Sequence, residues 1–253
     1  MPTAAAPQLS DAQLVEMLEL LEGADSVELK LTVPAEDQRS SIEALGFDPL
    51  DAQVRLIYFF DTPDLALNRA GVVVRARRIA RKGEDSVVKL RPVVPDALPK
   101  KLRRDPGFGV EVDAMPGGFV CSGRLRVEAP SLGVADAATG ERPLRKLFSK
   151  QQRALFAEHA PDGVALDDLR TLGPIFILKL KGTAPGFGRK VVAELWLFPD
   201  GSRILELSTK CLPSEAFQVA AEGRASLIER GIPLTGEQET KTRRALEFFS
   251  AAL

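Results

Sequence analysis

The stretch Leu56–Arg78, LIYFFDTPDLALNRAGVVVRARR, decides the fold that we expect for this chain. It opens with an aromatic run, turns at Asp61–Asp64, and breaks at Gly71 before a second apolar run. This pattern predicts two β-strands joined by a turn and a short link. Side chains alternate between the two faces of a strand, so Arg75 and Arg77 point the same way, opposite the apolar residues between them.

The same alternation of apolar and charged residues recurs in other predicted strands. In Ser26–Val33, for example, the charged residues share one face and the valines and leucines share the other. The stretch Gly117–Gly140 has no clear period, although Arg124 and Arg126 could lie on a short strand. The remaining predicted strands are Ser86–Arg91, Gly109–Asp113, Ile175–Lys181, Lys190–Phe198 and Arg203–Lys210.

Helical spacing of apolar residues predicts several helices around these strands. The first, Ser10–Glu22, has a serine cap with Gln13 three residues later, and Gly23 follows its end. The start of the helix predicted within Pro143–His159 could also be extended. The other predicted helices are Pro34–Leu45, Pro213–Arg230 and Gly236–Leu253.

The charged faces of the predicted strands carry more cations than anions. An antiparallel sheet with one face in water also alternates in this way. Here, however, cations recur in pairs two residues apart, and such pairs repel unless an anion lies between them. The cations are Lys30, Arg75, Arg77, Lys89, Arg91, Lys179, Lys181 and Lys210, and the anions are Glu28, Glu111, Asp113, Glu194 and Glu206.

A closed antiparallel barrel would explain this pattern if its exterior is apolar under helices and its charged interior holds a polyanion and a metal. Phosphate chains suit these residue types, because arginine binds phosphate oxygens in a fork and carboxylates hold Mg²⁺ or Mn²⁺. The carboxylates could also be counter-ions only. We expect one α+β domain over residues 1–253, with an N-terminal helix in 1–23 and a divergent, insertion-like segment at 117–174.

The composition excludes several other classes of protein. The chain has 253 residues, 45% of them hydrophobic, which is enough to bury a core. A net charge of −1 gives no general attraction to nucleic acid or anionic membranes. Cys121 and Cys211 are too few for a disulfide framework, and Met1–Ser10 lacks the apolar core of a secretory signal. With no apolar run of about 20 residues, we expect a soluble, cytoplasmic protein.

Other catalytic chemistries have little support in the sequence. His159 is the single histidine and lies on a predicted helix, so neither a Ser-His-Asp site nor a histidine-rich metal site is expected. The Pro-Gly-Phe-Gly sequences lack the spacing of a nucleotide-binding loop and indicate turns. The basic segment Lys100–Arg104 fits a solvated loop, and contact with RNA is the alternative.

Two segments of the chain have similar sequences, which we call the internal echo. The segments Lys89–Asp113 and Lys179–Leu195 both place a Lys-x-Arg/Lys strand before Pro-Gly-Phe-Gly and a strand that carries an acid. Coincidence is one explanation. We favour a hairpin that is duplicated in a barrel of two halves.

Several of these segments together resemble the CYTH superfamily, also called triphosphate tunnel metalloenzymes. The resemblance spans nearly the whole chain from Ser26 onward, and the hairpin with its paired arginines is its most specific part. The segments are VELK at Val27–Lys30, YFFDTPDLALNRAGVVVRAR at Tyr58–Arg77, VVKLR at Val87–Arg91, GSRILELSTK at Gly201–Lys210 and TKTRRAL at Thr240–Leu246.

The resemblance implies an eight-stranded antiparallel tunnel and assigns roles to the charged residues. Glu111 and Asp113 match an acidic pair, whereas Ser26 and Ser208 stand where the family has glutamate. Lys181 stands where arginine is common. The expected phosphate-binding residues are Lys30, Arg75, Arg77, Lys89, Arg91, Lys179, Lys181, Lys210 and Lys241. The expected metal ligands are Glu28, Glu111, Asp113, Glu194 and Glu206, and the expected catalytic residues are Lys30, Glu111 and Glu206.

We therefore expect metal-dependent hydrolysis of a triphosphate, with Mg²⁺ or Mn²⁺ as the cofactor. A triphosphate- or polyphosphate-binding protein that has lost catalysis is one alternative, and an adenylate cyclase of the class IV type is another. The expected partner is a small-molecule triphosphate or polyphosphate. Neither a membrane nor a nucleic acid is expected as a partner, and the chain would be a monomer or a homodimer.

Overall fold

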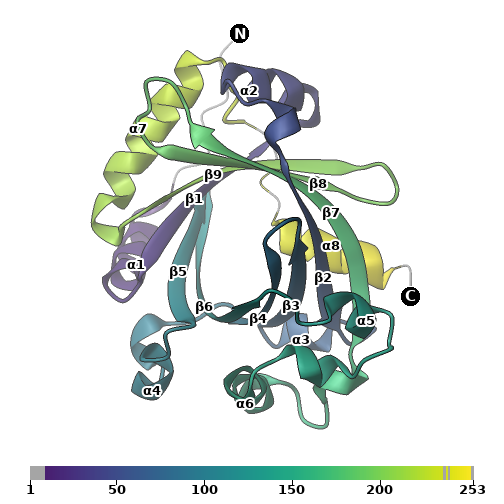
Figure 1. Ribbon diagram of the computed structural model, residues 1–253. Coiled ribbons are helices and arrows are strands. Elements are labelled where there is room, and N and C mark those ends of the chain that lie inside the picture. The colour runs from purple at the N-terminus through teal and green to yellow at the C-terminus, as the bar shows by residue number, and fades with distance from the viewer. Residues whose placement is uncertain (1–8, 236–237, 239, 252–253) are drawn as a thin grey trace.

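The computed structural model describes residues 9–235, 238 and 240–251. Within this part of the chain, nine strands close into one barrel in the order β1-β5-β6-β4-β3-β2-β7-β8-β9 (Figure 1). Neighbouring strands are antiparallel, except that β1 runs parallel to β5. The strands are β1 (Ser26–Val33), β2 (Gln53–Asp61), β3 (Val72–Ile79), β4 (Gly83–Leu90), β5 (Phe108–Met115), β6 (Gly118–Ala129), β7 (Arg170–Thr183), β8 (Lys190–Leu197) and β9 (Arg203–Cys211).

The expected α+β class and closed barrel with flanking helices are confirmed, but the expected eight antiparallel strands are wrong. The barrel has nine strands among the described residues and is mixed. The additional strand is β6, which comes from the stretch without a clear period and lies between β5 and β4. The parallel pair joins β1 to β5, which are separated along the chain by β2, β3 and β4.

The duplicated hairpin is also wrong. The second copy of the echo is a true hairpin, because β7 and β8 pair directly. In the first copy β4 and β5 are not neighbours, since β6 pairs with both of them. The shared sequence therefore does not correspond to a shared strand pairing.

Most helices lie on the outside of the barrel (Figure 1). The predicted helical ranges contain Asp11–Glu22, Gln38–Ala44, Lys150–His159, Ala216–Glu229 and Lys241–Ser250, whereas the short helices Ala66–Arg69, Lys100–Arg103 and Val134–Ala138 were not predicted. The Ser10 side chain accepts from the Gln13 backbone N–H, and the Gln13 side chain accepts in turn from the Ser10 N–H, a capping box that starts α1. The last helix was predicted over 236–253, of which residues 236, 237, 239, 252 and 253 lie outside the described part. The helices are α1 (Asp11–Glu22), α2 (Gln38–Ala44), α3 (Ala66–Arg69), α4 (Lys100–Arg103), α5 (Val134–Ala138), α6 (Lys150–His159), α7 (Ala216–Glu229) and α8 (Lys241–Ser250).

The turn in the hairpin β2–β3 is built around one buried carboxylate. Asp61 accepts hydrogen bonds from the backbone N–H groups of Thr62, Leu67 and Asn68, at 2.7, 2.9 and 3.0 Å. Gly71 then has a φ of 74°, and a Cβ there would lie 2.7 Å from the carbonyl oxygen of Arg91. The glycine is needed for both reasons, and it fixes where β3 begins.

The apolar faces of the strands pack under the helices. Met17 and Leu21 of α1 cover Val27 of β1 and its neighbours on β5. Leu155 and Phe156 of α6 pack on the apolar faces of β3, β4 and β6. By the alternation of side chains, the charged residues of these strands lie on the opposite face.

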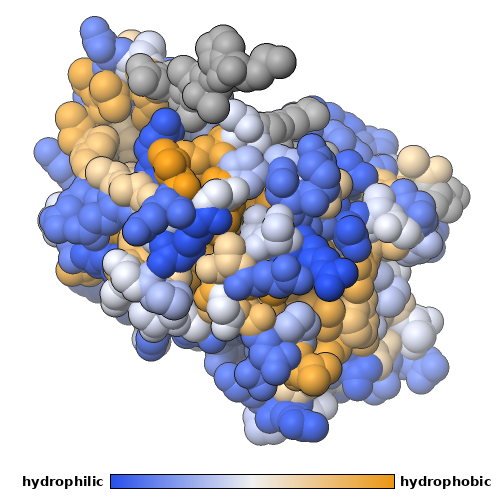
Figure 2. Space-filling model, turned by 90° about the horizontal axis from the view of Figure 1, so that it is seen from above, coloured by the Kyte–Doolittle hydropathy of each residue, from blue (hydrophilic) through white to orange (hydrophobic). Residues whose placement is uncertain are grey.

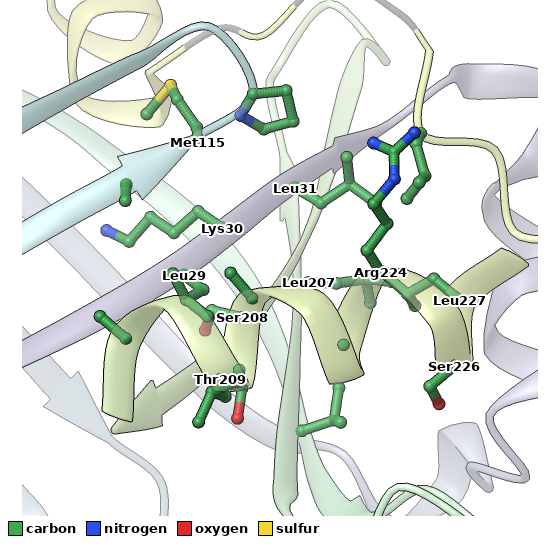
Figure 3. A pocket seen from close by; sticks show the side chains of 18 of the residues that line it. Leu29, Lys30, Leu31, Met115, Leu207, Ser208, Thr209, Arg224, Ser226 and Leu227 are labelled. Carbon is green, nitrogen blue, oxygen red and sulfur yellow. The ribbon is translucent and has the colours of Figure 1, made fainter. Parts of the chain in front are cut away.

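Helix α7 lies less tightly on the barrel. A cavity of about 320 Å³ separates it from β1 and β9. Leu31 of β1, Leu207 of β9 and Leu227 of α7 are among its lining residues (Figure 3). The face shown in Figure 2 carries apolar patches among its polar side chains. None of the helices in the described residues has the length and apolar character needed to cross a membrane.

The segment 117–174 supplies β6, α5, α6 and the start of β7. Gln152 of α6 is fully buried and forms hydrogen bonds with both β4 and β6. Its amide nitrogen donates to the carbonyl oxygens of Ser86 and Leu125, at 2.9 and 3.1 Å. Its amide oxygen accepts from the Ser86 hydroxyl and from the Ser149 N–H.

We expect Gln152→Ala to lower the free energy of unfolding by about 2–4 kcal/mol, because it leaves two buried carbonyl groups and a hydroxyl without partners. Urea unfolding followed by circular dichroism measures this loss. The exposed neighbour Gln151→Ala is the matched control and should change stability by less than about 0.5 kcal/mol. Equal stability of the two variants would contradict the role given to Gln152.

Candidate functional site

The strand face opposite the one that packs under α1 and α6 carries a network of ion pairs, which we call the charged face. At its centre, Glu28, Glu111 and Asp113 each offer a carboxylate oxygen within 4.8 Å of the others. The parallel pairing of β1 with β5 explains this, because it sets Ser26 opposite Glu111 and Glu28 opposite Asp113. We call these three residues the acidic cluster.

Cations from several strands surround the acidic cluster. Lys30 Nζ lies 2.8 Å from Asp113 and 3.2 Å from Glu28. Lys89 and Arg91 approach the other oxygen of Asp113, at 3.3 and 3.4 Å. Glu111 is paired with Lys210 of β9. Each of the three carboxylates therefore has at least one cationic neighbour.

These contacts shift the acid–base equilibria of the cluster. Burial alone would raise the pKa of Asp113, but Lys89, Lys30 and Arg91 outweigh it and hold the pKa below its usual value. The pKa of Glu28 is lowered in the same way, by Lys30 against burial. Burial would lower the pKa of Lys30, yet Asp113 and Glu206 raise it. Asp113 and Glu28 are thus held ionised and Lys30 is held protonated.

A second group of charges surrounds Asp85 of β4, which is fully buried. Arg77 contacts it with two nitrogens, Nε at 2.9 Å and Nη2 at 2.6 Å. Arg126 of β6 contacts the same carboxylate at 2.7 Å and is also paired with Glu128. Arg77, expected to bind phosphate, is thus already held by a carboxylate of the chain.

Arg75 differs from its neighbour Arg77. Among the residues that the structure describes, its side chain has no hydrogen-bond or ion-pair partner, and its Nε is buried. Burial and the nearby Arg77 lower the pKa of the Arg75 guanidinium. This is the direction expected for a cation that lacks a counter-ion. The Nε of Arg124 on β6 is likewise buried without a hydrogen-bond partner in the described chain.

Glu194 and Glu206 form a third group, directly opposite each other on β8 and β9. Lys241, the first residue of α8, lies between them, with Nζ 2.7 Å from Glu194 and 2.8 Å from Glu206. Lys179 of β7 also contacts Glu194, at 2.9 Å. Burial would raise the pKa of Glu194, but Lys241 and Lys179 lower it well below its usual value.

Most of the predicted site residues therefore come together, but in distinct groups. Lys181 does not join them, because it lies exposed near the end of β7 and makes no ion pair within the described chain. His159 ends α6, with its Nδ1 3.0 Å from the Leu155 carbonyl oxygen. The basic segment Lys100–Arg104 contains α4, whose Arg103 pairs with Asp25.

Sequence reasoning missed Asp85 and Arg55 and left Arg126 open. Arg55 of β2 lies 3.9 Å from Glu194. By the alternation of side chains, both missed residues lie on the charged face. Asp85, for example, lies four positions before Lys89 and two before Val87. Asp85 and Arg55 were missed because the predicted strands began three residues too late, at Leu56 and Ser86, whereas β2 begins at Gln53 and β4 at Gly83.

Comparison with known proteins supports the fold. No protein-family model matches the chain, and no curated protein is similar to it in sequence. The crystal structure of a proposed adenylate cyclase from Bacillus halodurans matches with a TM-score of 0.60 at 12% identity, over 87% of this chain and 98% of that one. A proposed adenylyl cyclase from Hippeastrum, described as having a dominant triphosphatase activity, matches with a TM-score of 0.60 at 19% identity, over 86% and 94%.

These two structures share the architecture of this chain over nearly their whole lengths. At such identities the likeness establishes the fold. It agrees with the family resemblance that the sequence carries, and it leaves the chemistry of the charged face to be argued from its own residues.

The charged face should make the protein sensitive to acid. Asp113, Glu28 and Glu194 have lowered pKa values in the folded state, so the stability they contribute is present above their unfolded values of 3.8 and 4.5 and is lost as pH falls through the folded values. We expect a melting temperature that is level near neutral pH and falls below about pH 4.5.

Melting temperatures of the wild type and of Asp113→Asn, measured from pH 7 to pH 3, test this. The variant should lose part of the acid-side slope, and Glu19→Gln, at an exposed position on α1, should keep the wild-type slope. Parallel curves for the wild type and Asp113→Asn would contradict the ionised, ion-paired state of Asp113.

Proposed function

We propose that this chain is a CYTH-superfamily protein that binds a triphosphate inside its barrel and hydrolyses it with the help of a divalent metal. The family resemblance of the sequence and the shared fold of the two solved structures support this assignment. The triphosphatase activity described for the Hippeastrum protein makes hydrolysis the first reaction to test.

The charged face is inferred to line the inside of the barrel. In a closed barrel one face of each strand points outward and the other points inward. The apolar faces pack under α1 and α6, so the opposite faces point inward. Ion pairs that skip a strand fit this placement, such as Lys89 of β4 with Asp113 of β5, which are separated by β6.

The unpaired cation Arg75 is the observation that carries the proposal. Withdrawing a guanidinium from water without a counter-ion costs several kcal/mol, and proteins rarely bear that cost without a purpose. A bound anion would remove it. Lys89, Arg91 and Lys179 lie on the same charged face and can shift part of their charge to such an anion. A phosphate chain offers the several anionic oxygens that these cations require.

The acidic cluster fits a Mg²⁺ or Mn²⁺ ion. Its three carboxylates supply the hard oxygen ligands that these ions prefer, and their ligand atoms lie close enough together to share one ion. Glu28, Glu111 and Asp113 would hold the metal. A bound divalent ion would neutralise phosphate charge and fix the orientation of the phosphate chain.

The chain's own residues would act chiefly by positioning and by charge. Arg75, Lys89 and Arg91 would bind the non-bridging oxygens, on which negative charge accumulates as water attacks the terminal phosphorus in line with the leaving oxygen. Lys30, whose pKa is raised, would remain a cation and would not serve as a base. No nucleophilic side chain is needed, because water is the attacking group.

One alternative is favoured by a specific observation. Ser208 donates to Glu28 at 3.0 Å, and Ser26 lies 3.5 Å from Glu111, so hydroxyl groups occupy positions where the resemblance leads us to expect carboxylates. A barrel with fewer metal ligands could bind a triphosphate without cleaving it. Binding without turnover is therefore the second candidate function.

We expect Arg75→Gln to lower kcat/KM for triphosphate hydrolysis by about 30- to 900-fold, which corresponds to roughly 2–4 kcal/mol for the loss of one charge-assisted fork. The assay measures phosphate release from inorganic tripolyphosphate and from ATP, with Mg²⁺, Mn²⁺ or EDTA. Arg39→Gln is the matched control, because its side chain is 91% exposed and it should behave as the wild type.

The outcomes separate the candidate functions. Chelator-sensitive phosphate release that Arg75→Gln lacks supports a hydrolase, and cyclic AMP formed from ATP would instead identify a cyclase. No turnover, together with a rise in melting temperature on adding tripolyphosphate, would identify a binding protein. Turnover that is unchanged in Arg75→Gln would contradict the role of Arg75.

The acidic cluster is tested by Glu111→Gln. Removing one ligand charge should weaken the apparent affinity for Mn²⁺ at least tenfold, seen as a higher Mn²⁺ concentration for half-maximal phosphate release. Glu43→Gln, an exposed change of the same kind on α2, should leave that concentration unchanged. The same Mn²⁺ dependence in both variants would remove Glu111 from the metal site.

A further inference from the structure

Helix α8 packs on the same strand face as the charges. Its Ala245 and Leu246 contact a buried apolar cluster that includes Ile177 of β7, Trp196 of β8 and Ile204 of β9. These three residues lie two positions from Lys179, Glu194 and Glu206, respectively, and so share their faces. The helix thereby brings its first residue, Lys241, to the carboxylates of β8 and β9.

Lys241 is held firmly between Glu194 and Glu206. Only 9% of its side chain is exposed, and each carboxylate gives one oxygen to its ammonium group. The ammonium also lies 5.0 Å from the centre of the Trp196 ring, within the range of a cation–π contact. Two carboxylates directly opposite each other on neighbouring strands would repel without such a cation.

The position between two facing carboxylates is one that a divalent metal could otherwise take. We propose that Lys241 is a built-in cation that occupies the place of a metal between Glu194 and Glu206, so that the chain binds divalent metal only at the acidic cluster. This inference rests on the proposed function for the presence of a metal at that cluster. It extends the proposed function by stating how many metal ions the chain binds and which residue limits that number.

The acidic cluster and the pair Glu194 and Glu206 differ in how far nearby cations balance their negative charge. When an anion draws Lys89, Arg91 and Lys210 away, the acidic cluster keeps three carboxylates against Lys30 alone, a deficit that matches one divalent ion. Glu194 and Glu206 are already neutralised by Lys241 and Lys179. Even without Lys179 they carry one net negative charge, and the ammonium group fills the space between them.

The test counts Mn²⁺ ions bound per chain, from the loss of the electron paramagnetic resonance signal of free Mn²⁺, without triphosphate. Lys241→Gln should bind one Mn²⁺ more than the wild type. The double variant Lys241→Gln/Glu206→Gln should lose that additional ion. Arg243→Gln removes the same charge from the same helix at a side chain that is 73% exposed, and it should bind the wild-type number.

Stability gives a second measurement if Lys241→Gln folds poorly. Mn²⁺ should raise the melting temperature of Lys241→Gln by roughly 5–10 °C more than that of the wild type, at a concentration about 100 times the dissociation constant. An equal number of ions in wild type and Lys241→Gln, with an equal Mn²⁺ effect on melting, would overturn the inference. So would a wild type that already binds at Glu194 and Glu206, shown by loss of an ion in Glu206→Gln.

The same experiment keeps this inference separate from the proposed function. A wild type that binds no Mn²⁺, beside a Lys241→Gln variant that binds one, supports the role of Lys241 and means that the acidic cluster takes metal only after an anion has drawn its cations away. Suppose instead that the wild type binds one ion, that Glu111→Gln loses it, and that Lys241→Gln binds no second ion. This result overturns the role of Lys241 and leaves the proposed function intact.

Discussion

A charge that is withdrawn from water must meet an opposite charge, and this requirement links the strands of the barrel to one another. Asp113 is fully buried on β5 and contacts Lys30 of β1, Lys89 of β4 and Arg91 just beyond β4. Leaving a buried charge unpaired costs about 3–5 kcal/mol, so these strands are coupled through one carboxylate. Lys210 of β9 reaches Glu111 of β5 across β1 in the same way.

The alternation of residues predicted the strands and their charged faces because it follows from local backbone geometry. It could not predict strand order, which depends on contacts between distant segments. The pairing of β1 with β5 and the position of β6 between β5 and β4 are both of this kind. The charge pattern led us to expect a closed barrel. The family resemblance gave its number of strands, which is wrong because β6 arises from the divergent segment 117–174.

The site was predictable in its residue types and less so in its pairings. Parity placed Arg75 and Arg77 together, but only the structure distinguishes the unpaired Arg75 from Arg77, which is held by Asp85. Asp85 is on a neighbouring strand, opposite Arg77 in the pairing of β3 with β4. Lys181 had the same parity as Lys179, but side chains near the end of a strand meet solvent. The alternation of side chains predicts the strand face on which a residue lies, but it does not predict how deeply that residue is buried.

Three features of the charged face each weaken the binding of a second divalent metal ion. Ser26 and Ser208 place neutral hydroxyl groups beside Glu111 and Glu28, where carboxylates would add negative charge. Lys241 neutralises Glu194 and Glu206, which face each other on β8 and β9. Each change weakens the attraction for a second divalent ion, whereas the acidic cluster keeps its three carboxylates. If this chain hydrolyses a triphosphate, its fixed cations must therefore supply charge stabilisation that a second metal would otherwise provide, which gives the unpaired Arg75 a larger share of the work.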